Sequence, residues 1–390
     1  MKGMKTLRSG RNRRKWIYVL LLMGLLGLSG CGSPSSASVE MSSQTELVKT
    51  GSMELQYAEN FAVDYYEDGY KMLTTLPDSK RYLLVPEGQP VPKGLDEDVS
   101  ILQEPLQNIY LVASGVMDMF ASVDAVDQIR FSGQKQENWY IQTAKDAMAA
   151  GDMIYAGKYS KPDYELLVSE GCDLAIENRM ITHSPEVVEM LQGFDIPVMI
   201  EYSSYEQHPL GKVEWVKFFG ALTGKEAEAE EAFAEQTEIL EKVESGEKTG
   251  KTIAFFYVTS NGLIQVRQST DYIPKLIELA GGRYIFEDLE DSGSGRSTLN
   301  MQVEDFYAGA RDADILIYNS SIDGGVTTLD ELIGKCNILK DFKALQEGQV
   351  YCTTNDMYQQ SMAIGYLLQD MHTVLTDDDT AKLRYLFLLQ

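Results

Sequence analysis

The stretch Thr223–Gly246, TGKEAEAEEAFAEQTEILEKVESG, divides the chain into two halves and decides how the fold is organised. Thr223 and Glu226 have the spacing of a capping box, in which a hydroxyl and a carboxylate satisfy free amide groups at a helix start. Apolar residues then recur at helical spacing as far as Val243. About 23 residues at about 1.5 Å each predict a helix of roughly 34 Å, long enough to connect two lobes. A surface helix of one large domain is the alternative interpretation.

Both halves alternate short apolar runs with amphipathic stretches, which is typical of a parallel β-sheet covered by helices on both faces. In the first half we expect strands at 109–113, 128–131, 153–155, 174–176 and 197–200, and helices at 116–123, 140–149, 164–170 and 185–192. In the second half we expect strands at 252–258, 263–266, 315–318 and 350–352, and helices at 273–280, 303–310, 329–333 and 360–371. The sequence therefore predicts an α/β protein with a first lobe over 108–222, a bridging helix over 223–246 and a second lobe over 247–390.

The part of the chain before the first lobe has a different character. Short alternating runs with turn signals at Asp68-Gly69 and Pro77-Asp78 predict a small antiparallel β meander in the segment 53–107. The segment 31–52 is rich in serine and almost lacks large apolar residues, so we expect a disordered tether there.

Residues 1–30 have the pattern of an export signal. Basic residues from Lys2 to Lys15 precede an apolar run from Trp16 to Leu28, which is shorter than the roughly 20 residues that a membrane-spanning helix needs. Leu28-Ser-Gly-Cys31 resembles the lipobox of bacterial lipoproteins, which implies cleavage before Cys31 and a lipid anchor on that residue. A plain signal peptide or a short membrane anchor is the alternative.

Composition excludes one class of function. The chain has 34 Lys and Arg against 59 Asp and Glu, a formal net charge of -25. No cluster of basic residues lies beyond residue 15, so nucleic-acid binding is not expected. Cys172, Cys336 and Cys352 lack the spacing of a metal or redox motif, and we interpret them as buried small apolar residues.

Several stretches together resemble one protein family. They are Tyr110–Ser114, Asp127–Ser132, Lys161–Glu165, Cys172–Ile176, Gly193–Val198, Phe219–Gly224, Leu279–Gly282 and Glu304–Asp314. In their order and spacing over 108–385 they resemble the extracytoplasmic solute-binding proteins of iron-siderophore, haem and cobalamin ABC importers. The resemblance implies two Rossmann-like lobes bridged by a single long α-helix, a ligand cleft between the lobes, and delivery of the ligand to a permease dimer and its ATPase. The N-terminal meander departs from the family pattern.

Aromatic, amide and basic side chains follow the expected strands of both halves, and open α/β sheets bind ligands beyond the carboxyl ends of their strands. The candidate ligand-binding residues are Trp139, Tyr140, Lys158, Tyr159, Arg179, Tyr202, Tyr205, Tyr257, Arg267, Arg296, Tyr318, Asn319 and Tyr358. Aromatic rings with hydroxyl groups suit a bulky metal chelate, and Arg179, Arg267 and Arg296 suit an anionic one. Because the chain has 22 tyrosines, chance placement of these residues is the alternative.

Catalytic motifs are missing from the sequence. It contains no nucleophile elbow, zinc-binding His-Glu-x-x-His helix, phosphate loop or dinucleotide fingerprint. Gly293-Ser-Gly295 is interpreted as a flexible loop. A metal site at His183, His208 and Glu206 is less favoured than ordinary surface histidines. We therefore expect no enzymatic activity, no resident metal and no cofactor, with an extracytoplasmic enzyme, a metallochaperone, an adhesin or a sensor on the same scaffold as alternatives.

The family resemblance favours a metal chelate as the ligand, with a ferric siderophore preferred to haem or cobalamin. It also implies that Glu165 and Glu304, one on each lobe at the start of a helix, dock into the permease subunits. The helix dipole favours an acid in the first helical turn by about 0.3–1 kcal/mol, which would place carboxylates there without any partner.

Overall fold

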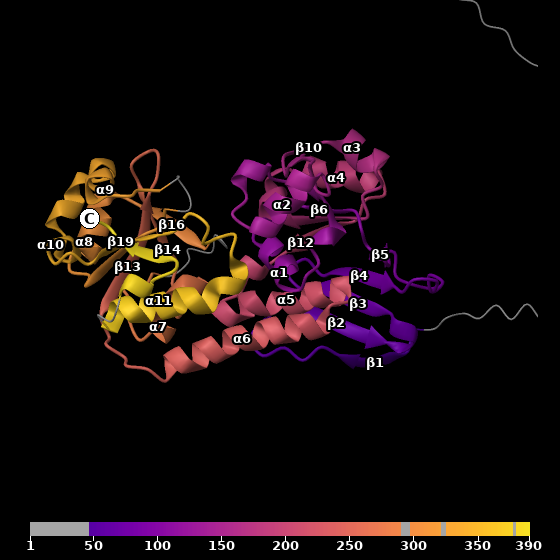
Figure 1. The fold of residues 1–390 in the computed structure, drawn as a ribbon, viewed down its shortest axis with the longest axis horizontal. Helices are drawn as coiled ribbons and strands as arrows, with labels where there is room; N and C mark the ends of the chain where they lie inside the picture. Colours follow the sequence, from indigo (N-terminus) through magenta and orange to yellow (C-terminus); the bar gives the residue numbers. More distant parts are fainter. Residues whose placement is uncertain (1–46, 290–296, 321–324, 377–379) are drawn as a thin grey trace, which may run out of the picture. The chain divides into compact units, whose positions relative to one another are not determined.

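The computed structural model describes residues 47–289, 297–320, 325–376 and 380–390, and these belong to one compact unit. Within them, an N-terminal sheet and two further sheets covered by helices follow one another along the chain (Figure 1). No helix in the described ranges is long and apolar enough to cross a membrane.

The N-terminal sheet has the strand order β1-β2-β3-β4-β5. Its strands are β1 (Lys49–Ser52), β2 (Phe61–Tyr66), β3 (Lys71–Thr75), β4 (Lys80–Val85) and β5 (Val99–Gln103). The first four pair antiparallel, as a meander does, and β5 pairs parallel with β4. β1 occupies the last residues of the segment whose composition predicts a tether.

The first lobe is built on a five-stranded parallel sheet with the order β12-β11-β6-β7-β8. These strands are β6 (Ile109–Leu111), β7 (Ile129–Ser132), β8 (Ile154–Tyr155), β11 (Leu174–Asn178) and β12 (Val198–Glu201). A two-stranded ribbon is formed by β9 (Gly157–Lys158) and β10 (Lys161–Pro162). The helices are α1 (Val116–Ser122), α2 (Gln142–Ala150), α3 (Tyr164–Ser169) and α4 (Pro185–Gly193). The expected alternation of strand and helix is confirmed here.

The second lobe has a mixed sheet with the order β16-β14-β13-β17-β18-β19, and β15 pairs with β13. Its strands are β13 (Thr252–Val258), β14 (Ile264–Arg267), β15 (Arg283–Tyr284), β16 (Thr298–Met301), β17 (Ile315–Tyr318), β18 (Val350–Thr353) and β19 (Leu386–Leu388). Its helices are α7 (Tyr272–Leu279), α8 (Val303–Ala310), α9 (Leu329–Lys335), α10 (Lys343–Gln346) and α11 (Ile364–Thr376). β14, β16 and β19 run antiparallel to their neighbours.

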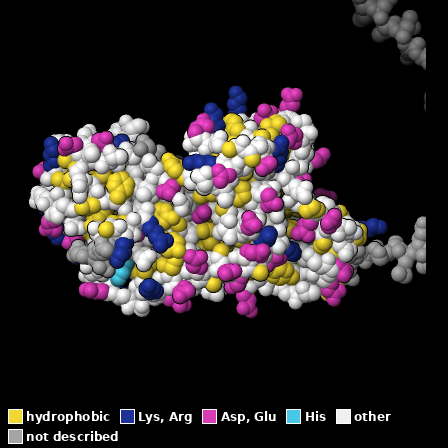
Figure 2. Space-filling model, in the orientation of Figure 1, with side chains coloured by type: hydrophobic (Ala, Val, Ile, Leu, Met, Phe, Trp, Pro, Cys, Tyr) yellow, Lys and Arg dark blue, Asp and Glu magenta, His cyan; other side chains and the backbone are white. Residues whose placement is uncertain are grey.

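Two helices connect the lobes, α5 (Pro209–Thr223) and α6 (Glu226–Glu244), which lie side by side in Figure 1. α5 packs against α1 of the first lobe and α7 of the second, and α6 packs against α5 and α11. The long bridging helix is therefore present as α6, but α5 was not predicted. Figure 2 shows acidic side chains along the edge that α6 forms and over both lobes.

The capping box expected at Thr223 and Glu226 is wrong. Gly224, with a φ of 71°, ends α5 in the left-handed conformation, and the Thr223 hydroxyl donates to the Phe219 carbonyl at 2.8 Å. α6 begins after Lys225 without a side-chain cap and spans 19 residues. Because Thr223 belongs to the last turn of a preceding helix, its hydroxyl bonds back to that helix and does not cap the next one.

One large apolar cluster joins the N-terminal sheet, the first lobe, α5 and part of the second lobe. Phe61 of β2 lies against Trp215 and Phe218 of α5, with ring centroids 4.9 and 5.3 Å apart. α5 is buried along almost its whole length. The first lobe and the second lobe thus both pack against α5. This helix holds the carboxyl ends of the first-lobe strands near the second lobe.

Candidate ligand-binding cleft

The carboxyl ends of the first-lobe strands face the second lobe across a cavity of about 210 Å³. From the first lobe, the cavity is lined by Ala113, Ser114 and Gly115 after β6, Asn178 at the end of β11, and Glu201 and Ser204 at β12. From the second lobe, it is lined by Arg267, Asp271, Tyr272, Ser297 and Tyr358, and α5 contributes Lys212. This is the position at which open α/β sheets bind ligands.

Arg267, the last residue of β14, is buried and held by several partners. Its guanidinium lies 3.3 Å from the Asp271 carboxylate and donates to the Tyr358 hydroxyl. Asn319 also donates to that hydroxyl, at 2.6 Å. The backbone of Arg267 bonds the Tyr284 hydroxyl through both its N–H and its carbonyl, at 3.0 and 2.8 Å. These contacts fix the guanidinium at the cavity wall.

Tyr358 and Asp271 are the buried groups that accompany Arg267. Burial is the main cause that raises the pKa of Tyr358, to about 12. Burial also raises the pKa of Asp271, against the opposing effect of Arg267. An arginine between a tyrosine and an aspartate forms a polar network that is already largely satisfied within the protein.

Lys212 of α5 is the second cation of the cavity, and it is only 3% exposed. Its Nζ lies 4.8 Å from the centre of the Tyr272 ring. Within the ranges that the structure describes, it forms no hydrogen bond or ion pair. Burial lowers the pKa of the ammonium, while Glu201, Tyr358 and Asp271 act in the opposite direction.

Glu201 brings a carboxyl group to the same cavity from the end of β12. One of its oxygens accepts hydrogen bonds from the backbone N–H and the hydroxyl of Ser203, at 2.8 and 2.6 Å. Burial raises the pKa of Glu201, and Lys212 opposes that rise. The cavity is therefore polar and charged rather than apolar.

Residues just before α11 close one side of the cleft against the first lobe. The Gln359 side chain accepts from the Tyr140 N–H and donates to the Asn138 carbonyl, both at 2.8 Å. A Cβ on Gly115 would lie 2.9 Å from the Ser361 hydroxyl and 3.2 Å from the Tyr358 carbonyl, so a larger residue at position 115 would force a shift at this edge. The two lobes are in direct contact at this edge.

Of the predicted ligand-binding residues, Arg267 and Tyr358 line the cavity. Asn319 donates a hydrogen bond to the hydroxyl of Tyr358. Arg179, Tyr202 and Tyr205 gather beside it, where β11 and β12 end. The Arg179 guanidinium lies 4.6 Å from the Tyr205 ring, and the Tyr202 and Tyr205 rings are 6.4 Å apart. Ligand contact by these three residues stays a prediction.

The remaining candidates lie away from the cavity or outside the described residues. Trp139 is buried and donates to the Ser132 hydroxyl at 3.0 Å, and Tyr318 is buried against Phe256. Tyr140 is exposed, Lys158 and Tyr159 lie at the β9–β10 ribbon, and Tyr257 packs on the apolar cluster of the second lobe. Arg296 and Gly293–Gly295 lie outside the described residues, as do Cys31 and the signal segment.

Several lining residues were not predicted from the sequence, among them Lys212, Glu201, Asp271, Tyr272 and Ser114. For Lys212 a signal was available, because it is a charged residue within the apolar stretch from Leu210 to Leu222. Glu201, Asp271 and Ser114 follow expected strands, but only their orientation in space distinguishes them from neighbouring polar residues.

The histidine-based metal site has no support in the described geometry. His208 Nδ1 accepts from the Leu210 N–H at 3.2 Å, and its ring stacks on Tyr57. The Glu206 carboxylate is occupied by the backbone N–H groups of residues 59 and 60 and by the Trp215 indole. Among the described residues, no three His, Cys, Asp or Glu side chains are placed to hold a metal ion.

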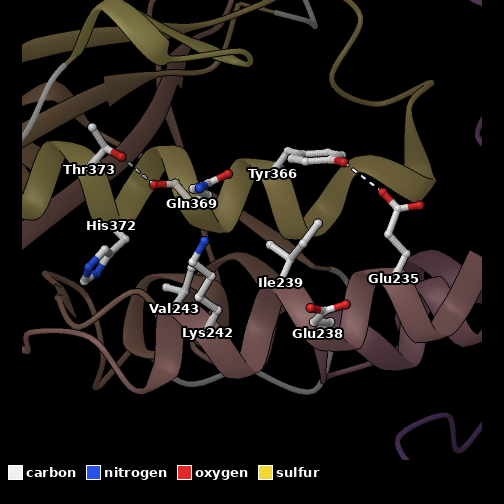
Figure 3. A pocket seen from close by; sticks show the side chains of 9 residues that line it. All are labelled: Glu235, Glu238, Ile239, Lys242, Val243, Tyr366, Gln369, His372 and Thr373. Atoms are coloured by element: carbon white, nitrogen blue, oxygen red, sulfur yellow. Dashed lines mark hydrogen bonds between the residues drawn. The ribbon is translucent and has the colours of Figure 1, made fainter.

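A larger hollow of about 480 Å³ lies between α6 and α11 (Figure 3). Glu235, Lys242, Tyr366 and His372 are among its lining residues, and the Tyr366 hydroxyl donates to Glu235 at 2.8 Å. Among the described residues, all those that line it belong to these two helices, and none is at a strand end. We therefore place the candidate site in the smaller cavity between the lobes, where the strand ends converge.

No known protein-family profile matches the chain. Two uncharacterized lipoproteins of Methanocaldococcus jannaschii are similar to it. One is 24% identical, with 92% of each chain covered, and the other is 23% identical, with 89% of this chain and 90% of the relative covered.

Two solved structures with a similar fold are periplasmic binding proteins by name. A possible iron-binding (periplasmic solute-binding) protein from Staphylococcus epidermidis is 17% identical, with a TM-score of 0.54 over 69% of this chain and 98% of that one. The periplasmic haem-binding protein HutB of Vibrio cholerae is 14% identical, with a TM-score of 0.55 over 68% and 98% of the two chains. The chain therefore has the two-lobed α/β fold of these periplasmic binding proteins, with the lobes bridged by a long helix and preceded by an N-terminal β-sheet.

Proposed function

We propose that the chain is a lipid-anchored, extracytoplasmic substrate-binding protein of an ABC importer. The fold shared with periplasmic solute-binding proteins supports this proposal, and so does the similarity to lipoproteins over most of the chain. The lipobox-like Leu28-Ser-Gly-Cys31 supplies the anchor. The observation that carries the proposal is the polar cavity between the lobes, where Lys212 and Arg267 face the carboxyl ends of β6, β11 and β12.

The ligand that fits this proposal best is a metal chelate, with a ferric siderophore preferred to haem or cobalamin. Of the two buried cations in the cavity, Arg267 is paired with Asp271, whereas Lys212 has no ion-pair partner among the described residues. Because a buried charge needs a partner, Lys212 suits an anionic ligand. A chelate brings its own metal coordination, so the protein needs no set of metal ligands. Binding without chemical change and release to a permease dimer with its ATPase would complete the function.

The test measures which ligand the mature protein binds. Protein starting at Gly32 is incubated separately with ferric citrate, ferrioxamine, haemin and cyanocobalamin, and native mass spectrometry with visible absorbance reports the bound species. We expect one equivalent of an iron chelate and no turnover of it. Failure of all four ligands to bind, or chemical conversion of a bound ligand, would contradict the proposed function.

A further inference from the structure

Lys212 of α5 is a buried cation whose presence the fold itself does not explain. Its side chain is 3% exposed, and none of the described residues gives its Nζ a hydrogen bond or an ion pair. It is the fourth residue of α5, close to the positive end of the helix dipole, where a cation is unfavourable. Burying a charge without a partner costs free energy, so a structural role would not favour lysine at this position.

A second buried lysine on the same helix, unlike Lys212, has carboxylate partners. Lys217 is 5% exposed, and its Nζ lies 3.5 Å from Glu214 and 2.9 Å from Glu230. The buried Lys217 therefore has the carboxylate partners that Lys212 lacks among the described residues. Lys212, five residues earlier, lines the cavity, and its Nζ lies 4.8 Å from the centre of the Tyr272 ring without an ion-pair partner among the described residues.

The other charged groups of the cavity are already engaged. Arg267 is bound to Asp271 and Tyr358, and one oxygen of Glu201 is bound to Ser203. The groups that face Lys212 are Glu201 from β12, Asp271 and Tyr272 at the start of α7, Arg267 from β14, Tyr358 from the loop before α11, and Asp118 from α1. None of them lies within ion-pair distance of Nζ, so the three donors of the ammonium are available to a ligand.

We infer that Lys212 is the anion-binding group of the cleft, and that the ligand presents a carboxylate or a similar oxyanion to its ammonium. This inference rests on the proposed function and narrows its ligand to anionic chelates. The cavity of about 210 Å³ is below the range of about 300–1,000 Å³ that is usual for small-molecule sites. A small chelate, or one carboxylate-bearing arm of a larger one, fits that size.

Because Lys212 lies on α5, which packs against both lobes, an anion bound there contacts the central helix of the protein. The bound anion would supply the missing partner of the ammonium and so stabilise its charged form. Affinity for the anion is therefore tied to the positive charge at this position, and not to the length or the packing of the side chain.

The test separates charge from shape with three variants. Lys212→Met removes the charge at similar length, Lys212→Arg keeps it, and Lys217→Met is the matched control on the same helix. Calorimetry with ferric citrate as the probe should show a loss of at least about tenfold in affinity for Lys212→Met, with binding retained by the other two variants. Thermal unfolding without ligand should be unchanged or raised for Lys212→Met, which would show that it is folded.

The outcomes distinguish this inference from the proposed function. Equal affinity of the parent and Lys212→Met for ferric citrate would overturn the inference and leave the proposed function standing. If citrate alone binds and Lys212→Met weakens it, while no metal chelate binds, the anion site is supported and the proposed function is contradicted. If the parent binds neither citrate nor ferric citrate, the inference is overturned. If the parent then binds uncharged cyanocobalamin, the proposed function is still supported.

Discussion

The carboxylate of Asp118 accepts a hydrogen bond from the backbone N–H of Met362 at 2.7 Å, which joins α1 of the first lobe to the segment that begins α11. Burial is the main cause that raises the pKa of Asp118, to about 6. Together with the Gln359 side chain, which bonds the backbone at Asn138 and Tyr140, this contact holds the lobes together beside the cleft.

Asp118→Ala should destabilise the protein by about 1–3 kcal/mol, because the Met362 N–H loses its acceptor in a largely buried position. Chemical denaturation measures the free energy of unfolding, and Asp118→Asn, which keeps an acceptor oxygen, serves as the control. Equal stability of the alanine variant and the parent would show that water replaces the carboxylate at this junction.

The same carboxylate predicts a pH dependence. Its pKa is higher in the folded protein than the usual value of 3.8, so folding favours the protonated form. Its contribution to stability is complete below about pH 4 and is lost as the pH rises through about 6. The difference in unfolding free energy between the parent and Asp118→Asn should change over this interval in that direction. A constant difference from pH 4 to pH 7 would contradict the assignment.

Glu214 of α5 fixes the entry to the N-terminal sheet. Its carboxylate accepts from the backbone N–H groups of Gln56, Tyr57 and Ala58 at 2.8–2.9 Å, and the side chain is buried. Glu214→Ala should lower the free energy of unfolding by at least about 3 kcal/mol, since each hydrogen bond to a charged group contributes about 1.5–3 kcal/mol. Limited proteolysis should then cut between residues 53 and 60, while the exposed control Glu59→Ala should resist. Resistance of both variants would contradict this role.

Glu177 of β11 is fully buried, and neither of its carboxylate oxygens has a hydrogen-bond partner among the described residues. Burial raises its pKa to about 8. The folded state therefore favours the protonated form, and the contribution of Glu177 is lost as the pH rises through about 8. Glu177→Met should be more stable than the parent, with a difference in melting temperature that grows between pH 6 and pH 9. A difference that does not change with pH would show that the carboxyl has an unseen partner.

The elements that could be predicted from the sequence are those with short, fully apolar runs. The bounds expected for β13, β17 and α8 agree with the structure. The two strands are short apolar runs and the helix has an apolar face, and both patterns can be recognised within a few neighbouring residues. α5 was missed because it is buried along nearly its whole length, charged residues included, so its sequence shows no amphipathic period. Without α5, Thr223 was interpreted as a helix start.

The site could be predicted only in part, for a related reason. Arg267 and Tyr358 lie in the region of strand ends, and that location is visible in a sequence. Tyr318 and Trp139 have the same chemical character but point into the core. Whether a residue near a strand end faces the cleft depends on the packing of both lobes around α5, which is a long-range property. The charge of Lys212 within an apolar stretch is visible in the sequence, but the cavity that it lines is formed by both lobes.

Replacement of Cys31, which lies outside the described residues, tests the proposed lipid anchor. Cys31→Ala should release the protein from membranes, because a diacylglycerol supplies the two chains that stable anchoring needs. Fractionation with carbonate washing measures the membrane-bound share, and metabolic labelling with a fatty acid reports the lipid itself. Full retention of the alanine variant would leave an uncleaved membrane anchor as the explanation.

Glu165 and Glu304 are the residues proposed to dock into the permease, and both are exposed in the first turn of their helices, α3 and α8. A double Glu165→Ala, Glu304→Ala variant should bind its ligand with parental affinity and fail to support uptake through its cognate permease. The helix dipole alone accounts for about 0.3–1 kcal/mol per acid, so the thermal stability of the variant should hardly change. The matched control replaces Glu189 and Asp305, exposed acids on the same two lobes, with alanine and should preserve uptake. If both double variants support uptake at the parental rate, Glu165 and Glu304 stabilise their helices and do not contact a permease.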